Sequence, residues 1–142
     1  MMLNKVPENL SHTQILMYLS QNEKWGRRNR ALYVLRKRLR IKDIATMTIA
    51  DILSTNMSIR RTYVSTIDNS TYELDPITRS ELQSYLFILL EDESHPFKDF
   101  WQTDLAIPLF PTNKRANFSA NTLAQYFSHL DRDIRNYFTH ED

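Results

Sequence analysis

The basic residues between positions 24 and 42 are the side chains of this sequence best suited to chemistry, and that chemistry is the binding of anions. Nine of the 18 Lys and Arg residues lie here, with no acidic residue among them. A guanidinium donates paired hydrogen bonds to carboxylate or phosphate oxygens, and an ammonium attracts the same anions as a point charge. Because so many like charges repel one another, a polyanion such as nucleic acid would relieve the repulsion.

From this cluster we predict a set of residues that bind the phosphate backbone of double-stranded DNA: Arg27, Arg28, Arg30, Arg36, Lys37, Arg38, Arg40 and Lys42. The net charge of +1 implies that such a surface is a patch and not the whole exterior. The alternative is a solvated helix face that binds nothing, which is common for a run of charge. For Arg40, an ion pair with Asp43 or Asp51 would satisfy the guanidinium within the chain.

Other reactive groups form no recognisable site. The absence of cysteine excludes disulfides, thiolate zinc sites and a thiol nucleophile. His12, His95 and His129 lie in different predicted elements without metal-ligand spacing. The last three residues, 140–142, contain ligand types, but chain ends are rarely held rigidly. We therefore expect no metal site, no cofactor and no catalytic residue, and we expect Tyr137 to serve in packing.

The elements that position the basic residues should be mostly helical, because one glycine and five prolines leave little material for tight turns. In the basic segment, Trp25, Leu32, Leu35 and Leu39 recur at helical spacing and predict a face packed on a core. β-branched and aromatic residues on both sides of a polar turn predict an antiparallel hairpin near 58–74. Helices are predicted at about 12–21, 25–38, 41–46, 76–91 and 119–138, with a short turn or helix at 48–53.

The domain organisation expected from the sequence is a single unit over residues 1–142, with a lead-in at 1–10, a body at 11–138 and a tail at 139–142. The expected core residues are Leu32, Leu35, Leu39, Leu86, Leu89, Leu123, Phe127 and Leu130. Ile77 belongs to the apolar stripe of the helix at 76–91 and is also expected to face the core. No run approaches the ~18 apolar residues of a membrane span, so we expect a cytoplasmic protein with no membrane contact.

Three short motifs carry a resemblance to a known family. Residues 28–32 (RNRAL), 39–44 (LRIKDI) and 48–52 (TIADI) resemble the opening of the catalytic domain of tyrosine recombinases, the phage-integrase family. In that family a helix beginning R-N-x-A-L is followed by G-L-R-I-S-E-L and a segment ending in D-I or D-V. Residues 109–111 and 119–127 are similar to later P-L-F and I-S-x-x-T-L motifs. The resemblance implies a mainly α fold with one small antiparallel hairpin (α+β), like the N-terminal half of that catalytic domain.

The same resemblance assigns one catalytic position. Arg40 matches the first catalytic arginine of the family, which holds the scissile phosphate, whereas Arg38 replaces the usual glycine and Lys42 and Asp43 replace S-E. The hairpin lysine of the family has no counterpart, since residues 64–74 contain no Lys or Arg. The second arginine, the histidines and the tyrosine nucleophile are also without counterparts.

The sequence therefore predicts a non-catalytic DNA-binding protein, similar to a truncated tyrosine recombinase and acting as an accessory or regulatory factor of a mobile element. The alternative is a protein-interaction module that binds a recombinase, another protein or a second copy of itself. Trp25, Phe100 and Trp101 would be its anchors, because aromatic residues dominate the energetics of interfaces.

Overall fold

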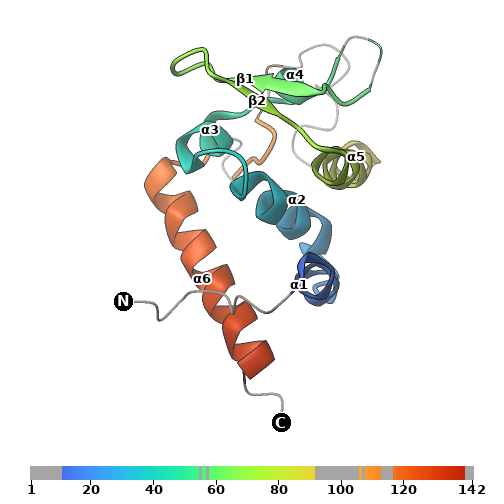
Figure 1. Ribbon diagram of the computed structural model, residues 1–142, viewed down its shortest axis with the longest axis vertical. Coiled ribbons are helices and arrows are strands. Elements are labelled where there is room, and N and C mark those ends of the chain that lie inside the picture. Colours follow the sequence, from blue (N-terminus) through green and yellow to red (C-terminus); the bar gives the residue numbers. More distant parts are fainter. Residues whose placement is uncertain are drawn as a thin grey trace.

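The computed structural model describes residues 11–54, 56, 58–91, 106, 108–112 and 117–139. In these parts the chain is mainly helical with one two-stranded antiparallel sheet, which confirms the predicted class (Figure 1). The elements are α1 (His12–Leu19), α2 (Gly26–Arg36), α3 (Ile41–Thr46), α4 (Ile49–Ile52), β1 (Thr62–Val64), β2 (Thr71–Glu73), α5 (Pro76–Glu91) and α6 (Ala120–Thr139). Each lies within a few residues of a predicted element.

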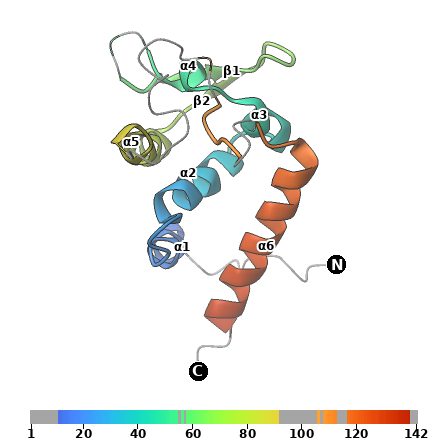
Figure 2. The same ribbon diagram turned by 180° about the vertical axis from the view of Figure 1, so that it is seen from behind.

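Helix α2 is the centre of the arrangement. It packs against α1, α3 and α5, and two opposite views place it between α5 and α6 (Figures 1 and 2). Residues 31–35 of this helix are all buried, so the middle of α2 is enclosed on every side. The basic residues are consequently divided into one group before this buried stretch and another group after it.

Side-chain caps define where the helices begin. Ser11 and Gln14 form a capping box at α1, in which each side chain bonds the backbone N–H of the other residue. At α6 the hydroxyl of Ser119 accepts the N–H of Thr122 at 3.1 Å, so Ser119 is the cap of this helix. Pro76 is the first residue of α5, a position where its missing N–H costs nothing.

The eight residues named above as the expected core, from Leu32 to Leu130, are all buried in it. Two other expectations were wrong. Ile77 is 53% exposed, because Thr78, Leu82 and Leu86 form the buried face of α5 and Ile77 lies on the outer face with Ile88. Trp25 is 38% exposed, because it precedes the first residue of α2 and its ring is covered by Arg28 in place of the core.

The hairpin is short and its turn projects outward. Strands β1 and β2 pair in antiparallel register, with Tyr63 opposite Tyr72, and Tyr63 is buried. The turn is closed by backbone hydrogen bonds from Ser65 to Ser70 and from Asn69 back to Ser65. Asn69 has a φ of 62°, in the left-handed region that Asn tolerates better than most residues.

Residues 109–111, which are similar to the P-L-F motif, lie beside the α3–α4 connection. Thr48 and Pro108 form an isolated antiparallel bridge, and the Leu109 N–H donates to the Met47 carbonyl at 2.9 Å. The expectations for residues 1–10, 95, 100, 101 and 140–142 lie outside the described residues. Among the helices that the structure describes, none has both the length and the apolar character needed to cross a bilayer.

Candidate nucleic-acid interface

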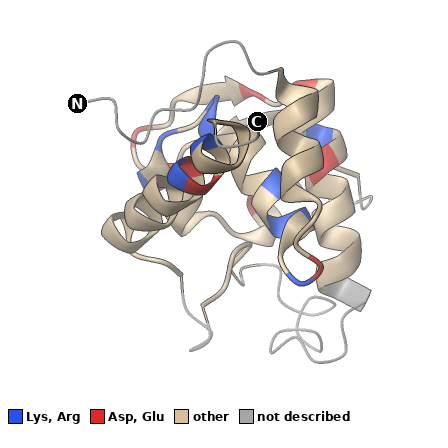
Figure 3. Ribbon diagram, turned by 90° about the horizontal axis from the view of Figure 1, so that it is seen from below, with Lys and Arg blue, Asp and Glu red and all other residues tan. Residues whose placement is uncertain are grey.

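The charges on the described chain are mixed in sign. Seen from below, Lys and Arg segments lie close to Asp and Glu segments on the same parts of the ribbon (Figure 3). Because opposite charges are neighbours, a basic residue that is predicted to bind a ligand can instead be satisfied by a carboxylate of the same chain.

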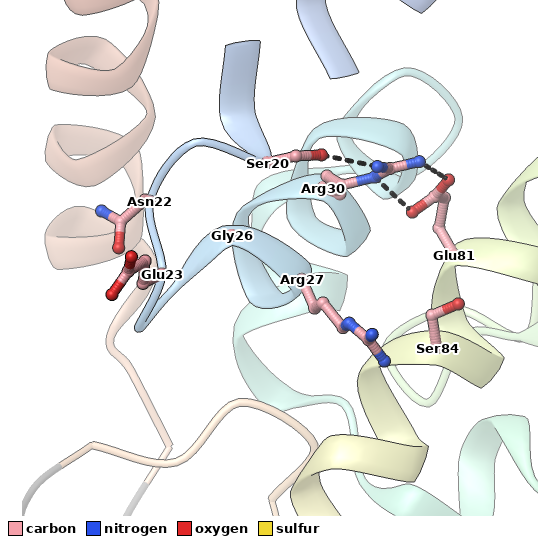
Figure 4. Close-up of a pocket in the computed structure, with 8 residues that line it drawn as sticks. All are labelled: Ser20, Asn22, Glu23, Gly26, Arg27, Arg30, Glu81 and Ser84. Atoms are coloured by element: carbon pink, nitrogen blue, oxygen red, sulfur yellow. Dashed lines mark hydrogen bonds and ion pairs between the residues drawn. The ribbon is translucent and has the colours of Figure 1, made fainter. Parts of the chain in front are cut away.

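Arg30 is engaged within the protein. Its Nε and one terminal nitrogen donate to the two carboxylate oxygens of Glu81 at 2.8 and 2.7 Å, and its other terminal nitrogen donates to the hydroxyl of Ser20 at 2.6 Å (Figure 4). Glu81 is buried, so loss of this fork would leave an unpaired charge in the interior. Arg30 therefore ties α2 to α5 and to the end of α1.

Arg28 has a similar role on the other side of α2. Its guanidinium stacks 4.0 Å from the ring centroid of Trp25 and donates to the hydroxyl of Tyr126 at 2.7 Å. The side-chain oxygen of the buried Asn29 accepts from both Arg28 and Tyr126. This network joins α2 to α6.

Arg27 is different, because it is exposed and forms no hydrogen bond or ion pair with the residues that the structure describes. It lines a polar pocket of about 420 Å³ and extends toward α5 on the side of Ser84 (Figure 4). The pocket also holds Glu23 and the Arg30–Glu81 pair, so its charges are balanced. Arg27 is therefore accessible, but no anion-selective site surrounds it.

Arg36 joins α2 to the middle of α6. Its two terminal nitrogens donate to the two carboxylate oxygens of Asp131 at 2.8 and 2.7 Å, and the guanidinium lies 4.8 Å from the ring centroid of Phe127. Both charged groups are largely covered. This geometry is that of a structural fork, because both nitrogens that could bind a phosphate are occupied by a carboxylate that is itself only 23% exposed.

The remaining predicted residues lie where α2 turns into α3, and we name Lys37, Arg38, Arg40 and Lys42 the α2–α3 corner. Lys37 and Lys42 are exposed, and no ion pair is formed by either with the described residues. One terminal nitrogen of Arg38 donates to Asp75 at 2.6 Å, while its side chain stays 46% exposed. Three of the four corner residues are exposed, whereas Arg27 is the one exposed residue among the other four of the predicted set.

Arg40 has the most ordered surroundings of the corner. Its Nε donates to the Asp43 carboxylate at 2.7 Å. One terminal nitrogen donates to Asp68 at 2.8 Å, and the other donates to Asp68 at 3.1 Å and to the hydroxyl of Ser65 at 3.2 Å. The predicted alternative of an ion pair with Asp43 is therefore present, whereas Asp51 instead accepts the backbone N–H of Thr48.

The two carboxylates on Arg40 differ in their environment. Asp43 is fully buried and also accepts the hydroxyls of Ser65 at 2.6 Å and Tyr63 at 3.4 Å. Burial, together with the Asp43 carboxylate, raises the pKa of Tyr63 to about 12. Asp68 is 42% exposed on the hairpin turn, and its hydrogen bonds from Arg40 and then Ser70 hold the pKa of its carboxyl well below the usual range.

Several relevant residues were missed by reasoning from the sequence. The local pattern marks Asp68 only as part of a polar turn, and nothing in it indicates a contact with Arg40. Arg61 and Arg79 were not predicted, yet both contact Leu74: the Arg61 carbonyl accepts its N–H, and Arg79 donates to its carbonyl. Since Asp75 follows directly and binds Arg38, the side chains of Arg38 and Arg79 and the backbone of Arg61 meet at the start of α5.

No protein-family model, curated protein or solved structure matches this chain. The resemblance to tyrosine recombinases thus rests on the short motifs alone and stays a prediction. Within the described residues, no cluster of three or more His, Cys, Asp or Glu side chains could hold a metal ion.

Proposed function

We propose that this protein is a cytoplasmic, non-catalytic DNA-binding protein that contacts the phosphate backbone through the α2–α3 corner. Its role would be that of an accessory or regulatory factor of a mobile element, as the recombinase-like motifs suggest. The observation that supports the proposal is the geometry of Arg40. Its Nε is held by the buried carboxylate of Asp43, and its two terminal nitrogens bind the exposed carboxylate of Asp68.

The support from Arg40 comes from shape and from charge. Two terminal nitrogens that meet the two oxygens of one carboxylate form a fork, and two oxygens of a phosphate fit the same fork. Fixing Nε on Asp43 removes rotational freedom of the guanidinium before any ligand binds, which lowers the cost of binding. Lys37 and Lys42 flank this fork in the sequence and supply exposed positive charge.

The proposed surface is smaller than the set predicted from sequence. Arg30 and Arg36 hold neighbouring helices through two-point ion pairs, and Arg28 is held between Trp25 and Tyr126. Backbone contacts alone provide affinity with little sequence preference. We therefore expect the protein to bind duplex DNA of many sequences with similar strength.

Strand cleavage is not part of the proposal. Transesterification requires an attacking group and a proton donor at the phosphate, in addition to a clamp. The ring of Tyr72 lies 5.7 Å from the Arg40 guanidinium as a cation–π partner. The hydroxyl of Tyr63, on the inner side of the site, is buried and bonded to Asp43. Its raised pKa makes the phenolate scarce at neutral pH.

A charge-reversal experiment tests the proposal. The double variant Lys37→Glu/Lys42→Glu should bind random duplex DNA more weakly, and its slope of log affinity against log salt should flatten by about 0.9 for each phosphate that is no longer neutralised. The matched control is Lys24→Glu/Arg132→Glu, which makes the same change in net charge at exposed positions outside the corner. Equal reductions of affinity in the two double variants would rule out the corner as the binding surface.

A second candidate function is supported by the groove beside Trp25. This groove of about 510 Å³ is lined by Tyr18, Trp25, Arg28, Tyr126 and other residues of α1, α6 and the α1–α2 turn. Trp25 is exposed and Tyr18, Arg28 and Tyr126 are half-buried. Trp, Tyr and Arg are the residue types that dominate the energetics of protein–protein interfaces. In this second function the groove binds a second copy of the chain or a recombinase subunit.

The two candidates are separated by Trp25→Ala. Sedimentation velocity of the wild type and of this variant measures self-association, and duplex binding is measured in parallel. Loss of self-association in Trp25→Ala with unchanged DNA affinity would support the interaction site. If the wild type and the variant are both monomeric, a second copy of the chain does not occupy the groove.

A further inference from the structure

We propose that Asp68 is an internal competitor for the phosphate position on Arg40, so that the hairpin turn restrains DNA binding until its carboxylate leaves. This inference rests on the proposed function, because it concerns the same fork of Arg40. It adds a regulatory contact that is built into the fold.

The first argument is the position of the Asp68 carboxylate. Its two oxygens lie 2.8 and 3.1 Å from the two terminal nitrogens of Arg40, which are the atoms that a phosphate would use. A phosphate and Asp68 cannot occupy this edge of the guanidinium together. The remaining Nε is held by Asp43 and offers no second edge.

The second argument is the difference between the two carboxylates. Asp43 is fully buried, so its departure from Arg40 would leave an unpaired charge in the interior. Asp68 is 42% exposed, so water can solvate its carboxylate as soon as it separates from Arg40. One partner of Arg40 is therefore permanent and the other is exchangeable.

The third argument is the construction of the turn. Ser65 is anchored below it, since its hydroxyl donates to the buried Asp43. Above this anchor, the strands are short and residues 66–69 are exposed. Asp68 can move with these outer residues while Ser65 and Tyr63 keep the base of the hairpin in place.

The corresponding pair at Arg38 lacks this freedom. Asp75 accepts the N–H of Thr78 at 2.9 Å and thereby caps α5, in addition to its contact with Arg38. Its departure would uncap α5, which packs directly on α2, whereas departure of Asp68 gives up only contacts within the turn and to Arg40. Asp68 is therefore the acidic group of the corner that a polyanion can replace at least cost.

The test compares Asp68→Asn with Asp133→Asn, an equal change of charge at an exposed acidic residue of α6. For a random duplex at about 0.1 M salt, Asp68→Asn should raise the affinity by about 5- to 10-fold and steepen the salt slope by about 0.9, as expected for one additional neutralised phosphate. Asp133→Asn should change the affinity less and leave the slope unaltered.

Two further measurements complete the test. The increase of affinity in Asp68→Asn should vanish in an Arg40→Gln background; if that variant does not fold, the Nε–H resonance of Arg40 should shift in Asp68→Asn at lower DNA concentration than in the wild type. If the wild type binds DNA, and Asp68→Asn raises that affinity no more than Asp133→Asn does, this inference is overturned and the proposed function stands. Absence of duplex binding in the wild type and both variants would overturn both.

Discussion

Nε of Arg40 lies 2.7 Å from a carboxylate oxygen of Asp43, and this carboxylate is fully buried. The pair lies at the start of α3, where Arg40 is the N-cap residue, and the hydroxyls of Ser65 and Tyr63 extend it to the hairpin. A surface arginine is thus oriented by a group that has no access to solvent. The fold therefore requires that the buried Asp43 carboxylate keep its hydrogen-bond donors, and the proposed interface gains a guanidinium of fixed orientation.

The first prediction concerns that requirement. Asp43→Ala should lower the free energy of unfolding by about 3–5 kcal/mol, because it removes the shared acceptor of three donors inside the protein. Urea denaturation measures the loss. Asp133→Ala, at an exposed position, should stay within about 0.5 kcal/mol of the wild type. A loss below about 1 kcal/mol for Asp43→Ala would mean that the network is not formed as described.

The second prediction assigns Arg36 to structure. A double-mutant cycle with Arg36→Ala and Asp131→Ala should give a coupling energy of about 1–2 kcal/mol, above the usual value for an exposed pair, because both groups are largely covered and bind at two points. The charge-neutral double variant should keep the duplex affinity of the wild type. A coupling energy near zero would show that the fork does not hold α2 to α6.

The third prediction separates two residues that sequence periodicity treats alike. Leu35→Ala should cost about 2–5 kcal/mol, since Leu35 is fully buried in the core. Ile77→Ala should cost less than about 1 kcal/mol, because that side chain is already more than half exposed. Thermal or urea unfolding measures both. Similar losses at the two positions would contradict the burial described for α5.

The fourth prediction concerns acid. Hydrogen bonds from Arg40 lower the pKa of Asp68, and hydrogen bonding to Thr78 together with the charge of Arg38 lowers the pKa of Asp75. A carboxyl whose pKa is lower in the folded than in the unfolded protein stabilises the fold fully above the unfolded pKa of about 3.9 and loses that contribution as the pH falls further. The urea concentration at the unfolding midpoint should therefore decrease once the pH is lowered below about 4.

The control for this prediction is Asp68→Asn, which removes one of the two groups. Its urea midpoint should fall less steeply with acid than that of the wild type. Identical pH profiles for the two proteins would show that Asp68 does not contribute.

The sequence predicted the helices well because each carries its own signal. Apolar spacing marked the buried stretch around Leu32 and Leu35, and Ser11 with Gln14 marked the start of α1. Such signals are local, and they arise from the periodicity and the unsatisfied donors of a single helix. The predicted hairpin was found for the same reason, since its polar turn lies between β-branched and aromatic residues.

The ion pairs could not be predicted in this way. Glu81 and Asp131 lie 51 and 95 residues from their arginines, and Asp68 lies 28 residues from Arg40. Charge density led to the prediction of a polyanionic partner, and it could not indicate that carboxylates of the same chain lie beside several of these arginines. Only the packing of α5, α6 and the hairpin around α2 brings them together.

DNA binding by the α2–α3 corner is tested most simply by the salt dependence of duplex binding in the wild-type protein. If the four residues of the corner each neutralise a phosphate, log affinity for a random duplex should fall linearly with log salt, with a slope of about −3 to −4 at about 0.9 per phosphate. If Asp68 keeps Arg40 occupied, the slope should lie nearer to about −3 and should approach about −4 in Asp68→Asn. Undetectable binding at low salt, or an affinity that salt does not change, would contradict the proposed function.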